Sequence, residues 1–172
     1  SPNSNFSGTD TFTVTVTDDL GGTTEQVVSV TVNAVDDAAS IGGDISGTVV
    51  EDATTAVTGT ITATDIEGLS GGYFSAGAAS NGTASINAES GEWSYIPNSN
   101  FSGTDTFTVT VTDDVGGTTT EDVTITVTAV DDPASISGDI TGSVVEDATT
   151  AVTGTITATD IEGLSGGYFA VT

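Results

Sequence analysis

The chain has 172 residues, 25 of them Asp or Glu, and it contains no Lys, Arg, His or Cys, so its formal net charge is −25. Without basic side chains, the carboxylates repel each other unless they are spread over a solvated surface or neutralised by cations from solution. Nucleic acid is all but excluded as a partner, because no basic group can displace phosphate counterions. Anionic membrane surfaces are disfavoured for the same reason, and no apolar run is long enough for direct membrane insertion.

The missing residue types also exclude most catalytic chemistry. Without His, Cys or Lys there is no Ser-His or Cys-His nucleophile and no Schiff base. Zinc and copper lose their usual ligands, which leaves oxygen donors that suit calcium or magnesium. A glycosidase acid would need a protected, partly apolar cleft, whereas the carboxylates here fall in predicted turns. The sequence therefore predicts a protein that is not an enzyme, and the absence of Cys fits a secreted bacterial protein.

An internal repeat organises the whole chain. The segment at 2–12 recurs at 97–107, and the segment at 49–55 recurs at 144–150, both with an offset of 95 residues. Across that offset, 62 of 77 aligned positions are identical. A period of this length corresponds to a small domain rather than to a solenoid turn.

The boundary between repeats is predicted at the pair Asp36-Asp37, which recurs as Asp131-Asp132. The chain then divides into the C-terminal part of one repeat, a complete 95-residue repeat and the N-terminal part of the next repeat; these span 1–36, 37–131 and 132–172. A window on a longer array explains the partial repeats. The alternative is that partial repeats of neighbouring chains complete each other, as in strand-donating filaments, although 18 residues of a repeat would be missing from such a composite.

The complete repeat shows strand periodicity from end to end. In the stretch 105–113, for example, Phe107, Val109 and Val111 alternate with threonines, as expected of a half-buried antiparallel strand. Seven strands are predicted, at about 39–50, 56–64, 72–79, 82–87, 91–96, 105–112 and 118–130. This count and size predict an all-β fold of tandem, immunoglobulin-like, seven-stranded Greek-key β-sandwiches. Aromatic residues such as Trp93 are interpreted as core packing rather than as a sugar-binding platform.

The acidic residues avoid the strand interiors and gather at the predicted ends of each sandwich. In an immunoglobulin-like fold the BC and FG loops face the incoming linker, whereas the AB and EF loops face the outgoing one. The sequence thus predicts two groups of oxygen donors. The incoming group is Asp36, Asp37, Asp65, Glu67, Asp113 and Asp114. The outgoing group is Glu51, Asp52, Asp105, Asp131, Asp132, Asp160 and Glu162, and Glu146 and Asp147 repeat the AB-loop pair in the next domain.

Calcium is the predicted cofactor of these groups, because it takes about 6–8 oxygen ligands and would cancel the repulsion between them. An ion bound there would also fix the angle between neighbouring domains. Other interpretations stay open: Asp113-Asp114 precedes Val-Gly-Gly and suits a tight hairpin turn without metal, and Glu51-Asp52 could be solvated loop charge.

Several motifs together resemble a known family. The stretches Gly47–Asp52, Thr58–Asp65, Gly91–Tyr95 and Thr104–Asp114 are similar to the VCBS and cadherin-like tandem repeats of large bacterial surface proteins, including RTX adhesins. The resemblance covers the whole chain. It implies extracellular sandwich domains in long arrays, stiffened by calcium at the junctions, and it likens Asp65-Ile-Glu67 and the Asp-Asp linker to cadherin junction motifs. Because this linker is shorter than that of cadherins, the sequence predicts one or two ions per junction rather than three.

The predicted function is a structural spacer or fibre module on the bacterial surface, whose partners are calcium ions and neighbouring repeats of the same chain or fibre. Near-identity of the copies favours this function. The alternatives are an adhesive module that binds carbohydrate or a cell surface, and a subunit of a strand-complemented filament. Differences between the copies occur at the start of the last strand, at Glu25 against Thr120, Gln26 against Glu121 and Val27 against Asp122, and give little support to a specific binding site.

Overall fold

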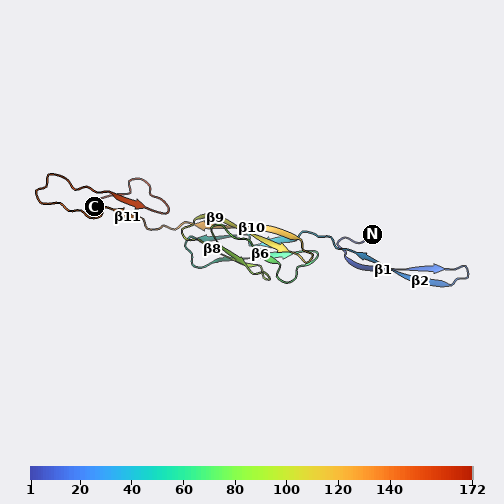
Figure 1. Cartoon of the computed structure of the whole chain (residues 1–172). Helices are drawn as coiled ribbons and strands as arrows, with labels where there is room; N and C mark the ends of the chain where they lie inside the picture. The colour runs from blue at the N-terminus through green and yellow to red at the C-terminus, as the bar shows by residue number, and fades with distance from the viewer. Residues whose placement is uncertain (172) are drawn as a thin grey trace.

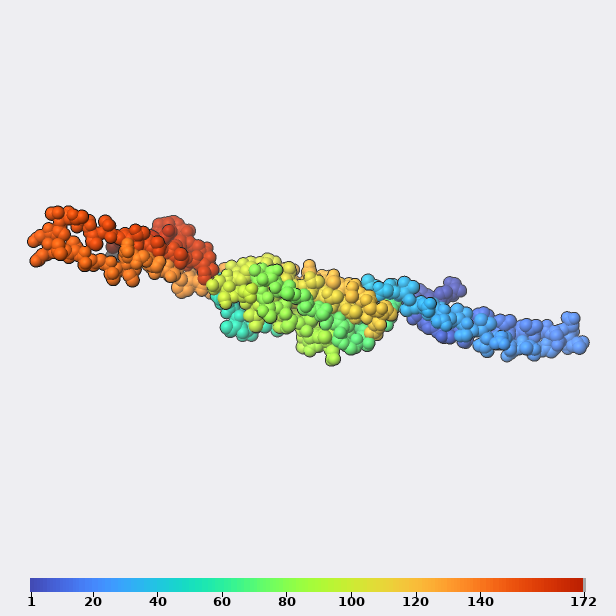
Figure 2. Space-filling view, in the orientation of Figure 1, coloured from blue at the N-terminus to red at the C-terminus, as the bar shows by residue number. Residues whose placement is uncertain are grey.

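The computed structural model describes residues 1–171, which form three parts arranged in a row. A β-hairpin, a central β-sandwich and a C-terminal two-stranded segment follow each other along an extended rod (Figures 1 and 2). All regular secondary structure in this part of the chain is β-strand. No helix that could cross a membrane occurs among these residues.

The central sandwich consists of two four-stranded sheets. Its strands are β3 (Ser40–Gly43), β4 (Ser46–Val50), β5 (Val57–Thr64), β6 (Phe74–Ala76), β7 (Gly82–Ile86), β8 (Glu92–Pro97), β9 (Gly103–Thr112) and β10 (Thr118–Thr128). One sheet has the order β3-β5-β8-β7 and the other β4-β10-β9-β6. The predicted all-β sandwich is confirmed.

The first predicted strand, 39–50, is wrong as a single element. It is divided between the two sheets: β3 pairs antiparallel with β5, whereas β4 pairs parallel with β10. The break lies at Gly43, whose φ of 98° is open mainly to glycine and where a Cβ would collide with the Thr60 carbonyl. Asp44 then accepts a hydrogen bond from the Thr60 N–H at 3.0 Å. The repeat therefore has eight strands rather than seven, and the predicted strand at 72–79 is reduced to β6.

The core lies between the sheets and follows the alternation in the sequence. Phe107, Val109 and Val111 on β9 are buried, while the threonines between them face away from the core. From the other sheet, Trp93 packs edge-on against Phe107 with ring centroids 5.8 Å apart. The Trp93 indole N–H donates to the Asp44 carbonyl at 2.8 Å, so burial leaves no unpaired donor on the ring. These residues pack the core, as predicted.

The flanking parts are the same strands without their partners. The hairpin β1 (Gly8–Thr17) and β2 (Thr23–Val32) corresponds to β9–β10, and β11 (Ser135–Gly138) with β12 (Ile156–Thr159) corresponds to β3 and β5. Phe12 is 55% exposed, whereas its counterpart Phe107 is 2% exposed. The hairpin thus presents an exposed apolar face. In the central repeat, the equivalent face of β9 and β10 is covered by the second sheet.

Candidate metal centre at the repeat boundaries

The AB-loop residue Glu51 turns its carboxylate into the outgoing boundary of the central sandwich. It follows β4 in a tight turn, where Asp52 has a φ of 56°. Its N–H donates to the Thr128 carbonyl at 2.9 Å, and its Oε1 accepts the Val130 N–H at 2.6 Å. The Glu51 side chain is only 2% exposed, and Oε2 is buried without a hydrogen-bond partner. A desolvated carboxylate oxygen of this kind is costly unless something positive approaches it.

Two further carboxylates meet Glu51 at this boundary. One oxygen each of Glu51, Asp132 and Glu162 lie within 4.8 Å of one another. The Asp132 N–H donates to Glu162 Oε2 at 3.2 Å, which attaches the linker to the BC loop of the next repeat. Asp132 Oδ2 is also buried without a partner. The cluster therefore joins the AB loop, the linker and the following repeat.

The local field at this boundary is strongly negative. Desolvation and then the neighbouring carboxylates Asp52, Glu51, Asp160 and Asp131 raise the pKa of Asp132. No basic side chain exists anywhere in the sequence to offset this charge. The repulsion between these carboxylates can therefore be reduced by protonation of one of them or by a cation from solution.

The incoming boundary repeats the linker geometry one period earlier. The Asp37 N–H donates to Glu67 Oε2 at 3.2 Å, the same distance as in the Asp132–Glu162 bond. Asp65 Oδ1 accepts the N–H groups of Glu67 and Gly68 at 2.8 and 3.1 Å, which closes the BC loop. Asp65 Oδ2 is buried and has no partner. The BC loop thus holds one free carboxylate oxygen beside the linker.

The FG loop also lies at the incoming boundary. Asp113 Oδ1 accepts the N–H groups of Val115 and Gly117, both at 2.9 Å, so this residue does form the tight turn. Its carboxylate also lies against Asp36: a hydrogen bond between the two groups, then desolvation and the nearby charges of Asp113, Asp65 and Asp37, raise the pKa of Asp36. Burial opposes ionisation of Asp113, but these hydrogen bonds outweigh it and lower the pKa of Asp113.

The second FG-loop carboxylate has a structural role that the sequence did not indicate. Asp114 Oδ1 accepts both the N–H and the Oγ–H of Ser70, at 2.9 and 2.7 Å. The Asp114 N–H in turn donates to the Gly68 carbonyl at 3.2 Å. These bonds hold the FG and BC loops together, so that Asp65 and Asp113 share one surface. Ser70 carried no signal in the sequence, because a lone loop serine has many possible roles.

Each boundary in this chain shows part of one arrangement. The outgoing boundary contains the AB loop, linker and BC loop; the incoming boundary contains linker, BC loop and FG loop. Because the linkers are equivalent across the 95-residue offset, a complete boundary would combine Glu51, the linker carboxylates, the BC-loop pair and an Asp113 equivalent. Such a set is made entirely of oxygen donors, which hard cations such as calcium prefer.

Other predicted ligands lie outside these clusters or are already engaged. Asp105 is buried inside the repeat, where its oxygens accept from Tyr95 Oη, the Asn81 N–H, the Ser80 N–H and the Thr106 N–H. Burial acts against the Asp105 carboxylate, yet these bonds outweigh it and lower the pKa of Asp105. Asp105 therefore stabilises the fold. Burial and the Asp105 contact raise the pKa of Tyr95.

Asp52, in the AB loop, has one carboxylate oxygen that accepts a hydrogen bond. Asp52 Oδ1 accepts the Asn100 N–H at 2.9 Å, which ties the AB loop to the EF loop. The corresponding pair in the next repeat, Glu146 and Asp147, forms the same turn, with Asp147 at a φ of 60°, but on an exposed segment.

Two family models match the sequence. The model for a bacterial cadherin-like domain matches residues 36–129, and the model for a bacterial Ig domain matches residues 1–31. No curated protein matches the chain.

Proposed function

The chain belongs to the bacterial cadherin-like domain family, and from this premise we propose that it is an extracellular spacer whose repeats are held in line by calcium at their boundaries. Domains of the two matched families are typically extracellular or surface-exposed modules of adhesin type, and they are typically not catalytic. The finer assignment, to VCBS-type extender repeats of an RTX adhesin, is part of this proposal.

The observation that carries the proposal is the cluster of Glu51, Asp132 and Glu162. Its oxygens lie within 4.8 Å of one another although the sequence offers no basic side chain. Repulsion alone would separate three carboxylates. These three carboxylates nevertheless lie together at a domain boundary, and an ion that binds all three best explains this.

The donor set fits calcium on two further grounds. The cluster contains two buried carboxylate oxygens, Glu51 Oε2 and Asp132 Oδ2, that have no hydrogen-bond donor among residues 1–171. Calcium accepts carboxylate and carbonyl oxygens in flexible numbers, whereas magnesium demands near-octahedral geometry and keeps several waters. Glu51, Asp132 and Glu162 would hold the ion at the outgoing boundary, and Asp65, Asp36 and Asp113 would contribute at the incoming one.

The mechanical consequence follows from where the three residues belong. Glu51 is on the central repeat, Asp132 on the linker and Glu162 on the following repeat. An ion bound by all three would link two folded domains across a linker that otherwise permits them to move. The proposed work of the chain is therefore to keep an array extended, so that a distant binding domain is held away from the cell.

The test is thermal unfolding of the 172-residue chain in excess calcium, in chelator and in magnesium. At a calcium concentration of about 100 times Kd, binding to the folded state adds about 2.7 kcal/mol. For a domain of this size, that corresponds to a rise in Tm of roughly 10–20 °C. Magnesium is expected to give much less. Small-angle scattering should show a longer, narrower particle in calcium than in chelator.

An unchanged Tm and an unchanged scattering profile would refute the calcium proposal. The stiffness of the array would then have to come from direct contacts between domains. Equal stabilisation by calcium and magnesium would point to general screening of the charge rather than to a built site.

A further inference from the structure

We propose that the parallel strand pair β4–β10 is the tension-bearing element of the central repeat, the contact that resists separation when the chain is pulled from linker to linker. The inference deepens the proposed spacer function and rests on it only for the direction of the load. A spacer that holds a distant domain away from the cell is stretched along its own axis. The strands that lie between the two linkers therefore decide how much tension the repeat withstands.

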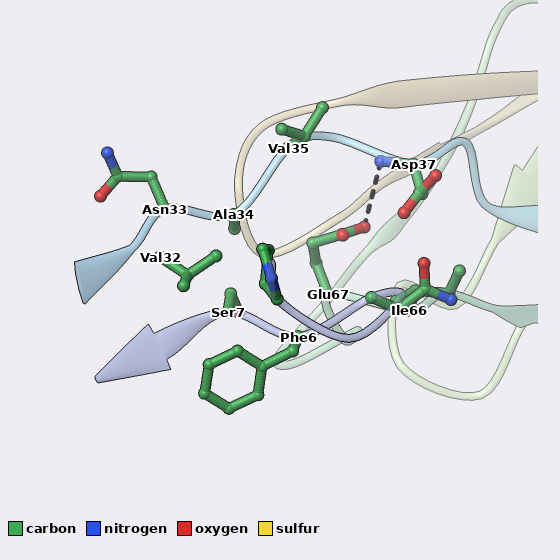
Figure 3. A pocket seen from close by; sticks show the side chains of 11 residues that line it. Phe6, Ser7, Val32, Asn33, Ala34, Val35, Asp37, Ile66 and Glu67 are labelled. Carbon is green, nitrogen blue, oxygen red and sulfur yellow. Dashed lines mark hydrogen bonds between the residues drawn. The ribbon is translucent and has the colours of Figure 1, made fainter. Parts of the chain in front are cut away.

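The path of the load can be followed along the chain. The two linkers join opposite ends of the sandwich, and its strands run along the axis between them (Figure 1). Tension from the incoming linker reaches Asp37, whose N–H donates to Glu67 Oε2 at 3.2 Å (Figure 3), and then passes into β3 and β4. Tension from the outgoing linker reaches Val130 and then β10.

The direction of β4 and β10 converts this tension into shear. The strands are parallel, with Thr124 opposite Ser46 and Thr128 opposite Val50. The incoming linker precedes β4 and the outgoing linker follows β10, so stretching pulls the two strands in opposite directions along their length. They can separate only by sliding, which strains the bonds of the ladder together. Strands that are pulled apart from one shared end would instead lose these bonds one at a time.

Hydrogen bonds close this ladder at both ends. The Thr124 N–H donates to the Ile45 carbonyl at 3.0 Å, and the Glu51 N–H donates to the Thr128 carbonyl at 2.9 Å. Beyond the ladder, the Val130 N–H donates to Glu51 Oε1 at 2.6 Å. Glu51 is only 2% exposed, so water has little access to compete for this bond. The point where outgoing tension enters β10 is thus bonded to the residue that follows β4.

The other strand pairs are less suited to this load. β3 receives the incoming tension before β4, but it pairs with β5 over only four residues. Two of them are Gly42 and Gly43, and glycine weakens a strand because it has no side chain to pack. β3 should therefore detach first and leave the load on β4. The pair β7–β8 belongs to the other sheet and connects to the linkers only through other strands.

The ladder provides a matched pair of substitutions. The bonds at its two ends fix the alternation along β4, which directs the N–H groups of Gly47 and Val49 toward β10 and that of Thr48 away from it. β4 is the edge strand of its sheet, so the Thr48 N–H faces no other strand among residues 1–171. Val49→Pro removes a donor near the middle of the ladder, whereas Thr48→Pro places proline where an edge strand tolerates it.

The test is single-molecule force spectroscopy of the full chain, in chelator, with attachment through Ala34→Cys and Pro133→Cys. The natural sequence has no cysteine, so attachment occurs only at these two points outside the repeat. Unfolding of the sandwich should lengthen the chain by roughly 300 Å. The force needed should fall to about half in Val49→Pro, because the interrupted ladder carries the load in two shorter parts. Thr48→Pro should unfold at the natural force.

A third variant separates tension bearing from general stability. The Asn87 N–H donates to the Glu92 carbonyl at 2.8 Å, so the alternation along β7 directs the Ser85 N–H toward β8. Ser85→Pro removes that donor and should lower Tm, but it should leave the unfolding force at the natural value. An unchanged force in Val49→Pro would overturn the proposal, as would an equal loss of force in Thr48→Pro or in Ser85→Pro.

A second attachment geometry tests the proposal without weakening any strand. Val115 is 52% exposed in the FG loop, at the same end of the sandwich as the incoming linker. Attachment through Ala34→Cys and Val115→Cys pulls β4 and β10 apart from that shared end, so the sandwich should unfold at a fraction of the force measured between the linkers. Equal forces in the two geometries would overturn the proposal, even if Val49→Pro failed to fold.

Repeating the measurements in calcium separates this proposal from that of the boundary ion. An ion bound by Glu51 and Asp132 would join the end of β4 to the linker after β10, and it should raise the linker-to-linker force. A force that is equal in calcium and in chelator, with the variants in the expected order, would contradict calcium at this boundary and support the role of β4–β10. Loss of that order in chelator would refute the role of β4–β10 whatever calcium does to Tm.

Discussion

The variant Glu51→Gln is expected to be more stable than the natural protein in chelator and less stable than it in calcium. In chelator, Glu51 is a nearly fully buried carboxylate with one oxygen unpaired beside two other carboxylates. An amide of the same size keeps the bond from the Val130 N–H, removes the charge and brings a donor toward Asp132. Relieving an unsatisfied buried charge is worth about 1–2 kcal/mol, so Glu51→Gln should unfold at the higher temperature.

In calcium the order changes, because glutamine is a poorer ligand. At 100 times its Kd, the ion adds about 2.7 kcal/mol to the natural protein. If the substitution weakens binding about a hundredfold, the variant gains only about 0.4 kcal/mol at the same concentration. The natural protein should then be the more stable of the two by about 1 kcal/mol, or roughly 4–8 °C in Tm.

The assay is thermal unfolding followed by near-ultraviolet circular dichroism, which reports on the buried Trp93. Glu92→Gln is the control, since it removes one charge from an exposed position whose carboxylate accepts a hydrogen bond from Ser90 Oγ at 3.1 Å. That variant should shift equally in both solutions. A Glu51→Gln variant that is less stable than the natural protein in chelator, or that keeps the full calcium shift, would refute the reasoning.

Two further predictions use features internal to the chain. Phe107→Ala should destabilise the central sandwich by about 3–5 kcal/mol, while Phe12→Ala at the equivalent, exposed position should leave its Tm unchanged; equal effects in thermal unfolding would contradict the assigned core. Asp105→Asn should cost about 1–3 kcal/mol at neutral pH, and because the folded-state pKa of Asp105 lies below its ordinary 3.8, the natural carboxylate stabilises the fold above that pH and loses this contribution as the pH falls through the folded value. Denaturant unfolding at several pH values should therefore show the difference between the two proteins shrinking below pH 3.8, and a constant difference would count against the assignment.

Much of the fold could be predicted because the alternation of apolar and polar residues specifies the strands and their buried faces. In β9 and β10 every second residue is apolar, and the buried set follows that pattern. The division of the first strand could not be predicted in the same way. It depends on the backbone of Gly43 and on the contact of Asp44 with β5, and a glycine in a run of small residues looks the same whether or not the strand is broken there.

The placement of the acidic loops was predictable for a different reason. Once the sandwich is assigned, chain order alone determines which loops share an end, and the Asp37–Glu67 and Asp132–Glu162 contacts lie where that order puts them. Metal binding by these groups stays a prediction. The role of Asp105 could not be predicted from its place beside the EF loop, because most of the donors that occupy its oxygens, Ser80, Asn81 and Tyr95, lie elsewhere in the sequence.

The contrast between Asp105 and Glu51 separates folding from alignment of the domains. Asp105 is a buried charge whose oxygens are all paired within one repeat, so it contributes to folding without any ion. Glu51 is equally buried, but its Oε2 has no hydrogen-bond partner, and its carboxylate lies close to those of Asp132 on the linker and Glu162 on the next repeat. The core itself is apolar and needs no cation. Removing calcium should therefore leave folded repeats on a mobile linker, because the interactions that a cation would complete are those between repeats rather than those within them.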